Sequence, residues 1–302
     1  MSGASNFVEG VDLSFVIILG ASIFFLVGIT IVMIYFVFKY RKKNNPKASH
    51  IHGNNKLEII WTVIPTILVL IMFYFGWMGY KPMREVPDDA IPINVYGQMW
   101  SWSYEYENGK ISDKLVVPLD KPVKLNLISR DVVHSFYIPA FRIKEDVVPG
   151  ANNYMWFIGQ EEGSYNVFCA EYCGERHAYM LSTVEVIPEV EYLAWLERSD
   201  IPEGEHPGLT IIKRNACVSC HSLDGSKLVG PSFKGVYGIT EVVMEGDTEV
   251  EITVDDEYIK SSISDPNAQV VKGYMPGLMI SYKDQLSDED VQQIIEYMKT
   301  LK

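Results

Sequence analysis

The sequence predicts a multi-domain membrane protein made of a two-helix transmembrane hairpin, an all-β domain and an all-α domain. Two long uncharged apolar runs lie near the N-terminus. From Ile91 onward apolar and polar residues alternate as in half-buried strands, and the chain ends in apolar residues at helical spacing. We expect the hairpin in residues 1–88, the β domain in residues 89–188, a linker in residues 189–206 and the helical domain in residues 207–302.

The two apolar runs are expected to cross the lipid bilayer. No charged residue occurs between Leu13 and Phe38, and a helix of that length spans about 39 Å, more than the ~30 Å hydrocarbon core. The second run, Ile59 to Tyr80, contains Pro65, which membrane helices tolerate. A cleaved signal peptide is the alternative for the first run, but that run is too long and no basic segment precedes it.

The loop between the runs, "KYRKKNNPKASHIHGNNK", is basic and carries no acid, whereas Glu9 and Asp12 precede the first run. Positively charged loops stay in the cytoplasm. Both termini and the two following domains are therefore expected on the outer face of the membrane.

The β domain is predicted from several short alternating segments. In "MWSWSYEY" the aromatic residues Trp100, Trp102, Tyr104 and Tyr106 share one face, and the turn signal "ENG" follows. "VKLNLI", "SYNVFC" and "STVEVI" are predicted as further strands. Together they predict a small antiparallel barrel or sandwich.

The rest of the chain is predicted to be mainly helical. "PEVEYLAWLERSDIPEGEHP" predicts a short helix followed by a linker. In "LSDEDVQQIIEYMKTL", Ser287 is the expected N-cap of a closing amphipathic helix. Its apolar face is formed by Val291, Ile294, Ile295 and Met298. An acidic insert from Glu241 to Glu257 contains "VEITV", which alternates like a hairpin strand.

The composition limits the possible functions. A net charge of -13 argues against nucleic-acid binding and favours a basic partner. The four cysteines form two close pairs, Cys169 with Cys173 and Cys217 with Cys220, a spacing more typical of metal or cofactor sites than of a disulfide framework.

The first pair lies in "CAEYCGERHAYM". Two thiolates in one loop can bridge two copper ions, each completed by an imidazole and a weak ligand. His177 and Met180 supply part of this set, and His134 is the other histidine of the β domain. A backbone carbonyl of the loop completes it. The alternatives are a local disulfide, which an outer-face domain permits, and a zinc site, which would not use Met180.

The second pair lies in "ACVSCH", which has the C-x-x-C-H spacing of covalent haem c attachment. Cys217 and Cys220 would form the thioethers and His221 would bind the iron. A redox-active dithiol is the alternative. The sixth ligand is expected to be a methionine in "GYMPGLMISYKDQLS".

These motifs resemble subunit II of a haem-copper cytochrome c oxidase with a fused class I cytochrome c domain. The loop fills every position of C-x-E-x-C-x-x-x-H-x-x-M. The resemblance implies a cupredoxin domain whose dinuclear CuA centre is bridged by Cys169 and Cys173. His134 and Met180 would complete one copper, and His177 with the Glu171 carbonyl would complete the other.

The resemblance extends to residues outside the metal loop. The carboxylate of Glu171 would also reach a magnesium ion shared with subunit I. "KLEIIWTVIP" places Glu58 at the entry of a proton path, and "MWSWSYEY" places Trp100 at the electron-entry position, although Met99 replaces the usual glutamine.

For the haem domain, the usual pattern G-Y-P-P-x-x-M-P implies that Met279 is the sixth ligand. In "LVGPSFKGVYG", Pro231 matches the family's proline that packs beside the haem. Ile280 stands where the pattern has proline, so Met275 remains the alternative.

The resemblance implies a bacterial plasma (inner) membrane protein that relays electrons. An external cytochrome or other donor would reduce haem c, then CuA, then the haem-copper site of subunit I, which reduces oxygen to water coupled to proton pumping. Other oxidase subunits are the remaining expected partners, and no nucleic acid is expected. A CuA-containing nitric oxide reductase subunit and a membrane-tethered electron carrier remain alternatives.

Overall fold

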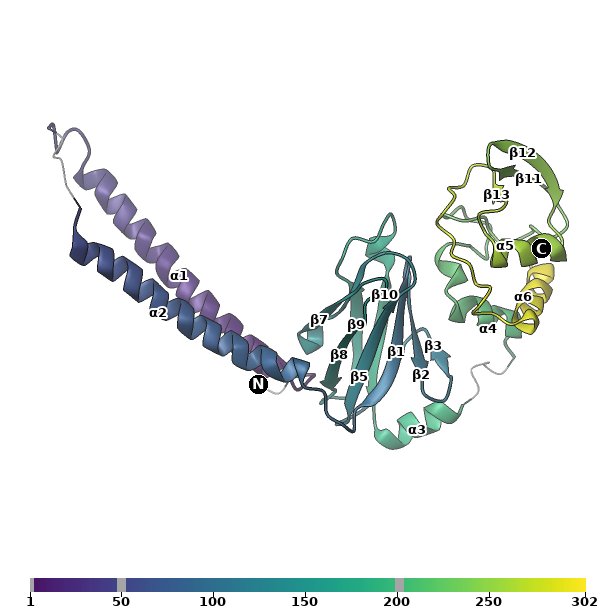
Figure 1. The fold of residues 1–302 in the computed structure, drawn as a ribbon, viewed down its shortest axis with the longest axis horizontal. Coiled ribbons are helices and arrows are strands. Elements are labelled where there is room, and N and C mark those ends of the chain that lie inside the picture. Colours follow the sequence, from purple (N-terminus) through teal and green to yellow (C-terminus); the bar gives the residue numbers. More distant parts are fainter. Residues whose placement is uncertain (1–2, 48–52, 199–203) are drawn as a thin grey trace.

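The computed structural model describes residues 3–47, 53–198 and 204–302. Residues 48–52 of the basic loop and 199–203 of the predicted linker lie outside the described residues. The chain forms a helical hairpin, a central β-sandwich and a C-terminal domain on the side of the sandwich away from the hairpin (Figure 1). The predicted fold class is confirmed.

The hairpin consists of α1 (Val8–Lys39) and α2 (Asn55–Tyr80). Their apolar side chains are largely exposed, and both helices are long and apolar enough to cross a membrane. The side chain of Asn54 caps α2 by accepting hydrogen bonds from the backbone N–H groups of Lys56 and Leu57 at 3.1 and 3.3 Å.

The base of the hairpin is attached to the sandwich by hydrogen bonds. The short helix η1 (Lys81–Arg84) follows α2, and the indole Nε1 of Trp156 donates to the carbonyl of Pro82 at 3.0 Å. The backbone N–H of Ile158 donates to Asn6 Oδ1, ahead of α1, at 2.8 Å. These bonds hold the β domain directly above the ends of both helices.

The sandwich contains two five-stranded sheets with strand orders β3-β2-β1-β5-β8 and β4-β10-β9-β6-β7. The first sheet comprises β1 (Ile91–Gln98), β2 (Ser101–Tyr106), β3 (Ile111–Ser112), β5 (Pro122–Ser129) and β8 (Asn153–Ile158). The second comprises β4 (Leu115–Pro118), β6 (His134–Ile138), β7 (Ile143–Val147), β9 (Gly163–Cys169) and β10 (Leu181–Ile187). A short helix η2 (Pro139–Phe141) connects β6 to β7.

The expectation of purely antiparallel sheets is wrong. β1 pairs with β5 in parallel, and β10 pairs with β4 in parallel. Alternation of apolar and polar residues reports which face of a strand is buried, but it carries no information about the direction of the neighbouring strand.

The aromatic strand packs into the core of the sandwich as expected. Trp102, Tyr104 and Tyr106 of β2 are almost fully buried, and Trp102 contacts Phe136 edge to face at 5.0 Å. The predicted turn after β2 contains Gly109 with a φ of 82°, a left-handed conformation that glycine adopts without strain. Trp100 lies just before β2, in the connection from β1.

The predicted short helix is α3 (Glu189–Glu197), which packs on the sandwich. Its Trp195 ring lies 4.9 Å from that of Tyr106. Tyr192 of the same helix is buried.

The C-terminal domain contains three α-helices and a small sheet. The helices are α4 (Pro207–Arg214), α5 (Asp256–Ser264) and α6 (Asp288–Thr300), with the 3-10 turn η4 (Cys217–Ser219). The sheet, β12 (Thr248–Thr253), β11 (Thr240–Glu245) and β13 (Val270–Val271), includes most of the acidic insert, so the predicted hairpin adds β structure to the helical domain.

Helices α4 and α6 pack closely through Gly208. A Cβ atom added there would lie 2.0 Å from the carbonyl oxygen of Gln293, so only glycine allows this approach. Ser287 caps α6 as predicted, in a capping box with Asp290. Ile294, Ile295 and Met298 are buried in the domain core.

Candidate metal centre and haem cavity

The predicted copper ligands come from three neighbouring segments of the sandwich. His134 begins β6, and Cys169 ends β9, which pairs with β6. The loop from β9 to β10 then carries Cys173, the turn η3 (His177–Tyr179) and Met180. Strand pairing therefore brings His134 to a loop more than thirty residues later in the chain.

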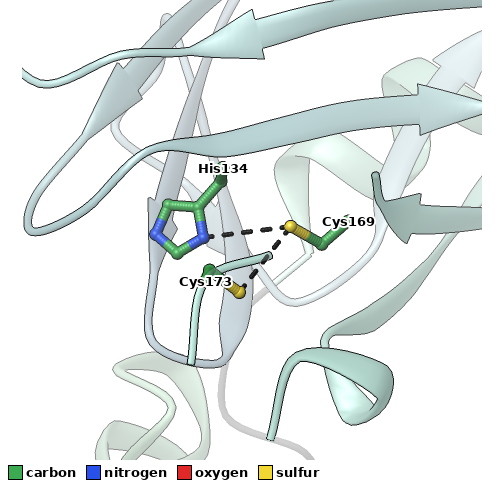
Figure 2. Close-up of side chains that lie close together, drawn as sticks. All are labelled: His134, Cys169 and Cys173. Carbon is green, nitrogen blue, oxygen red and sulfur yellow. Dashed lines mark hydrogen bonds between the residues drawn. The ribbon is translucent and has the colours of Figure 1, made fainter. Parts of the chain in front are cut away.

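The side-chain donors converge on one another. Cys169 Sγ lies 3.8 Å from Cys173 Sγ and 4.0 Å from His134 Nδ1 (Figure 2). Cys173 Sγ lies 3.6 Å from His177 Nδ1 and 3.7 Å from Met180 Sδ. Both thiols are free, so this pair forms no disulfide. Two thiols, two imidazoles and a thioether form a soft donor set that fits copper.

The carbonyl of Glu171 belongs to the same cluster. It accepts a hydrogen bond from Cys169 Sγ at 3.2 Å. The Glu171 side chain is exposed. Among the described residues, His134, Cys169 and Cys173 form the only cluster of three or more His, Cys, Asp or Glu side chains close enough to bind one metal ion. A magnesium ion at Glu171 would therefore need ligands from outside the described part of the chain.

The cluster is buried, and burial makes the two thiols unequal. Cys169, Cys173, His134 and Met180 are each less than a tenth exposed. Burial raises the pKa of Cys169, but hydrogen bonds with His134 and with backbone groups outweigh it and lower this pKa below the usual value. Burial and repulsion from Cys169 raise the pKa of Cys173. A metal binding both sulfurs must therefore displace a firmly held proton.

Asp131 is a residue at this site that sequence reasoning missed. Its Oδ1 lies 2.7 Å from His134 Nε2, and its Oδ2 accepts a hydrogen bond from the Met99 N–H at 2.6 Å. The carboxylate fixes the His134 tautomer with the proton on Nε2, which leaves Nδ1 available to a metal. The signal was an acid three positions before a predicted histidine ligand, in "DVVHSF".

Trp100 lies directly against the predicted copper loop. Its indole Nε1 donates a hydrogen bond to the carbonyl of Cys173 at 3.2 Å, and the residue is 4% exposed. A Cβ atom on Gly174 would lie 3.2 Å from this indole, so the loop packs tightly on the ring.

The haem motif forms a tight turn in the wall of an apolar cavity. The backbone N–H of His221 donates to the Cys217 carbonyl at 2.9 Å. His221 Nδ1 lies 2.7 Å from the carbonyl of Pro231, which fixes the proton on Nδ1 and leaves Nε2 for a metal. A Cβ atom on Gly230 would lie 2.7 Å from the His221 ring, so the backbone must approach the imidazole without a side chain.

The residues that line this cavity are those expected to hold the predicted haem. Its walls include both motif cysteines, His221, Pro231 and Met279. Burial raises the pKa of Cys217 and of Cys220 and lowers the pKa of His221. Met275 also borders the cavity but is 70% exposed, whereas Met279 is half-buried.

The wall of the same cavity also includes residues of the β domain. Gln98, Met99 and Asp131 line it together with the haem motif. The predicted haem site therefore borders two segments of the β domain: the connection that carries Trp100, and the loop that carries Asp131, the hydrogen-bond partner of His134.

Glu58 is not near these sites. It lies exposed in the first turn of α2, at the end of the hairpin away from the sandwich (Figure 1). Its surroundings in this chain are a helix N-terminus and solvent-exposed apolar side chains.

Comparisons with known proteins match all three parts of the chain. Residues 2–76 match the model of the cytochrome c oxidase subunit II transmembrane domain, residues 109–187 that of its periplasmic domain, and residues 206–302 that of cytochrome c. Cytochrome c oxidase subunit 2 of Alkalihalophilus pseudofirmus is 33% identical over 94% of this chain and 86% of its own. That of a Bacillus strain is 29% identical over 88% of this chain and 80% of its own. The periplasmic domain of cytochrome oxidase subunit II of Bradyrhizobium japonicum is 32% identical, with a TM-score of 0.36 over 37% of this chain and 95% of that one.

Proposed function

The chain belongs to the cytochrome c oxidase subunit 2 family, and we propose that it relays electrons from an external donor, through haem c and then the copper pair, to subunit I. Membership makes it a membrane-anchored component of an oxidoreductase complex, and its two extramembrane domains imply CuA copper and haem. Oxygen reduction to water and proton pumping are assigned to the assembled complex.

For copper, we assign the bridging role to Cys169 and Cys173. His134 with Met180 would complete one ion, and His177 with the Glu171 carbonyl would complete the other. The convergence of their donor atoms within about 4 Å supports this assignment. When bound, the copper pair supplies a one-electron redox centre.

For haem, we assign covalent attachment to Cys217 and Cys220 and iron binding to His221. Met279 is the proposed sixth ligand because it lies half-buried in the cavity wall while Met275 is largely exposed. Pro231 holds the His221 ring through its carbonyl.

A single observation carries the proposed relay: the haem cavity and the copper loop both contact the β1–β2 connection, Met99–Trp100. Met99 borders the cavity, and the Trp100 indole is hydrogen-bonded to the carbonyl of Cys173. This contact offers a short route through bonds between the two predicted redox sites.

The orientation and partners follow from the same proposal. The basic loop would be cytoplasmic and the two redox domains would face the periplasm or the outside of a bacterial plasma membrane. Glu58 would then lie at the cytoplasmic side, as a proton-path entry requires, and Glu171 would meet subunit I and any shared magnesium ion. The physiological donor would reach the haem domain first.

Rapid mixing of the assembled oxidase with a reduced cytochrome tests the order of the relay. We expect the haem c absorbance to change before that of copper, and we expect His221→Ala to abolish most donor oxidation. Reduction of copper before haem, or near-normal turnover of the variant, would contradict the proposed order.

A further inference from the structure

The β domain and the C-terminal domain touch through polar groups that are buried where they meet. Gln98, at the end of β1, is 6% exposed, and Tyr282 of the C-terminal domain is 7% exposed. The amide Nε2 of Gln98 donates to the Tyr282 hydroxyl at 2.8 Å. It also approaches the Asn215 carbonyl at 3.4 Å, to which the Tyr282 hydroxyl donates at 3.3 Å.

Both ends of the Gln98 amide have partners. Its Oε1 accepts a hydrogen bond from Arg130 Nη1 at 3.2 Å, and the Arg130 guanidinium lies 4.2 Å from the centre of the Tyr96 ring. A buried amide is stable only when its donor and acceptor are both satisfied. Here the β domain satisfies the acceptor and the C-terminal domain satisfies the donor.

A second contact joins the copper loop to the haem motif. Arg176, next to the predicted ligand His177, donates to the carbonyl of Ser219, which lies between the two motif cysteines. Beside it, Cys220 and Val229 pack against the buried apolar cluster of the β domain. The contact surface therefore combines an apolar part with two hydrogen-bonded groups.

We infer that this interdomain contact, formed by Gln98, Tyr282, Asn215, Arg176 and Ser219, holds the cytochrome domain in one docked position that covers the Met99–Trp100 connection. The occupant of this surface is the chain's own C-terminal domain. Met99 lines the haem cavity, and Trp100 is 4% exposed in this arrangement, so a diffusing protein donor has no direct access to the indole.

Docking differs from simple tethering in its physical consequence. A flexible linker alone supplies a high effective concentration, but the donor still has to search for its orientation before each transfer. A hydrogen-bonded contact removes that search, so electron transfer between the domains proceeds at a fixed rate. The geometry of the contact stands independently, but this role for it rests on the proposed relay from haem to copper.

Two substitutions perturb the contact to different extents. Tyr282→Phe removes only the hydroxyl group, which accepts from Gln98 and donates to Asn215, and loss of these two neutral hydrogen bonds lowers the docking equilibrium by about thirtyfold. Gln98→Lys places an ammonium group beside Arg130 in a buried site. The unpaired buried charge lowers the docking equilibrium by about a hundredfold or more. Tyr297→Phe is the matched control, because the Tyr297 ring contacts His206 within the C-terminal domain.

The experiment uses the full chain in detergent, loaded with copper and haem. Hydrogen–deuterium exchange is measured in peptides covering residues 98–103 and 215–221. Electron transfer from haem to copper is followed after flash reduction, at several solvent viscosities and protein concentrations. The copper EPR spectrum of each variant shows whether the metal site is intact.

We expect faster exchange in both peptides, about thirtyfold for Tyr282→Phe and larger for Gln98→Lys, with no change for Tyr297→Phe. Electron transfer should be independent of viscosity in the wild type and slower and viscosity-dependent in Gln98→Lys. Unchanged exchange in both contact variants, or a viscosity-dependent rate in the wild type, would overturn the inference. So would a rate that rises with protein concentration, because it would assign the surface to a neighbouring copy.

The two proposals fail in different ways. If no electron passes from haem to copper in the wild type, the proposed relay is wrong, and the exchange data still decide whether the domains dock through this contact. If transfer is fast but equal in all variants and exchange is unchanged, the relay stands and the docked contact does not.

Discussion

Asp131→Asn tests whether the carboxylate that contacts His134 controls the copper site. The side chain is 7% exposed, and its two oxygens accept from three groups: His134 Nε2 at 2.7 Å and the N–H groups of Val132 and Met99 at 2.6 Å each. An asparagine keeps one acceptor oxygen and turns the other position into a donor. At least one N–H group therefore loses its partner and faces another donor.

The expected magnitude follows from these contacts. A hydrogen bond to a charged group contributes about 1.5–3 kcal/mol. At about 1.4 kcal/mol per factor of ten, one lost bond lowers copper affinity by about ten- to a hundredfold. Loss of the group that hydrogen-bonds to a metal-binding histidine typically lowers metal affinity by about 10–100-fold, which is the same range. Loss of the buried negative charge should also raise the reduction potential of the site, because the oxidised centre is less stabilised.

Copper affinity is measured by titration against a competing chelator, and the EPR spectrum and potential of the loaded protein are recorded alongside. Asp113→Asn, at an exposed position of the same domain, is the control and should leave all three values unchanged. If Asp131→Asn binds copper within about twofold of the wild type, with the same spectrum and potential, the reasoning from its hydrogen bonds is refuted.

The remaining predictions test the two cofactor sites, the helix packing and the topology. The wild type should bind two coppers with the seven hyperfine lines of one electron shared by both nuclei, and Cys173→Ser should abolish this signal; stoichiometric zinc or a four-line spectrum would contradict the assignment. Met279→Leu should remove the methionine-to-iron charge-transfer band while Met275→Leu keeps it, and the reverse pattern would exchange their roles. Gly208→Ala should lower the unfolding free energy of the haem domain by about 3 kcal/mol in denaturant titrations, because its Cβ would overlap the α6 backbone; a wild-type midpoint would argue against this. Reporters fused to the basic loop should be cytoplasmic and those at the C-terminus external, and an external loop would exclude the proton-entry role of Glu58.

The sequence by itself determined the features that are encoded locally. Each membrane helix is marked by its own uncharged run, and the closing helix by Ser287 and the apolar residues that follow it. Cys169, Cys173, His177 and Met180 lie in one short loop, and the C-x-x-C-H motif is contiguous, so both predicted sites could be located before any contact was known. His134 could be added because the β domain offers few histidines.

The tertiary structure decided what depends on segments distant in the chain. Residue alternation showed which face of each strand is buried, but the parallel pairing of β1 with β5 required the assembled sheet. Asp131 joins His134 to Met99 only because β1 pairs with β5, whose end leads into the Asp131 loop. Gln98 and Tyr282, 184 positions apart, meet only when the β domain and the C-terminal domain dock. Local patterns report burial and turn chemistry, whereas the partners of a buried polar group are set by how whole elements and domains pack together.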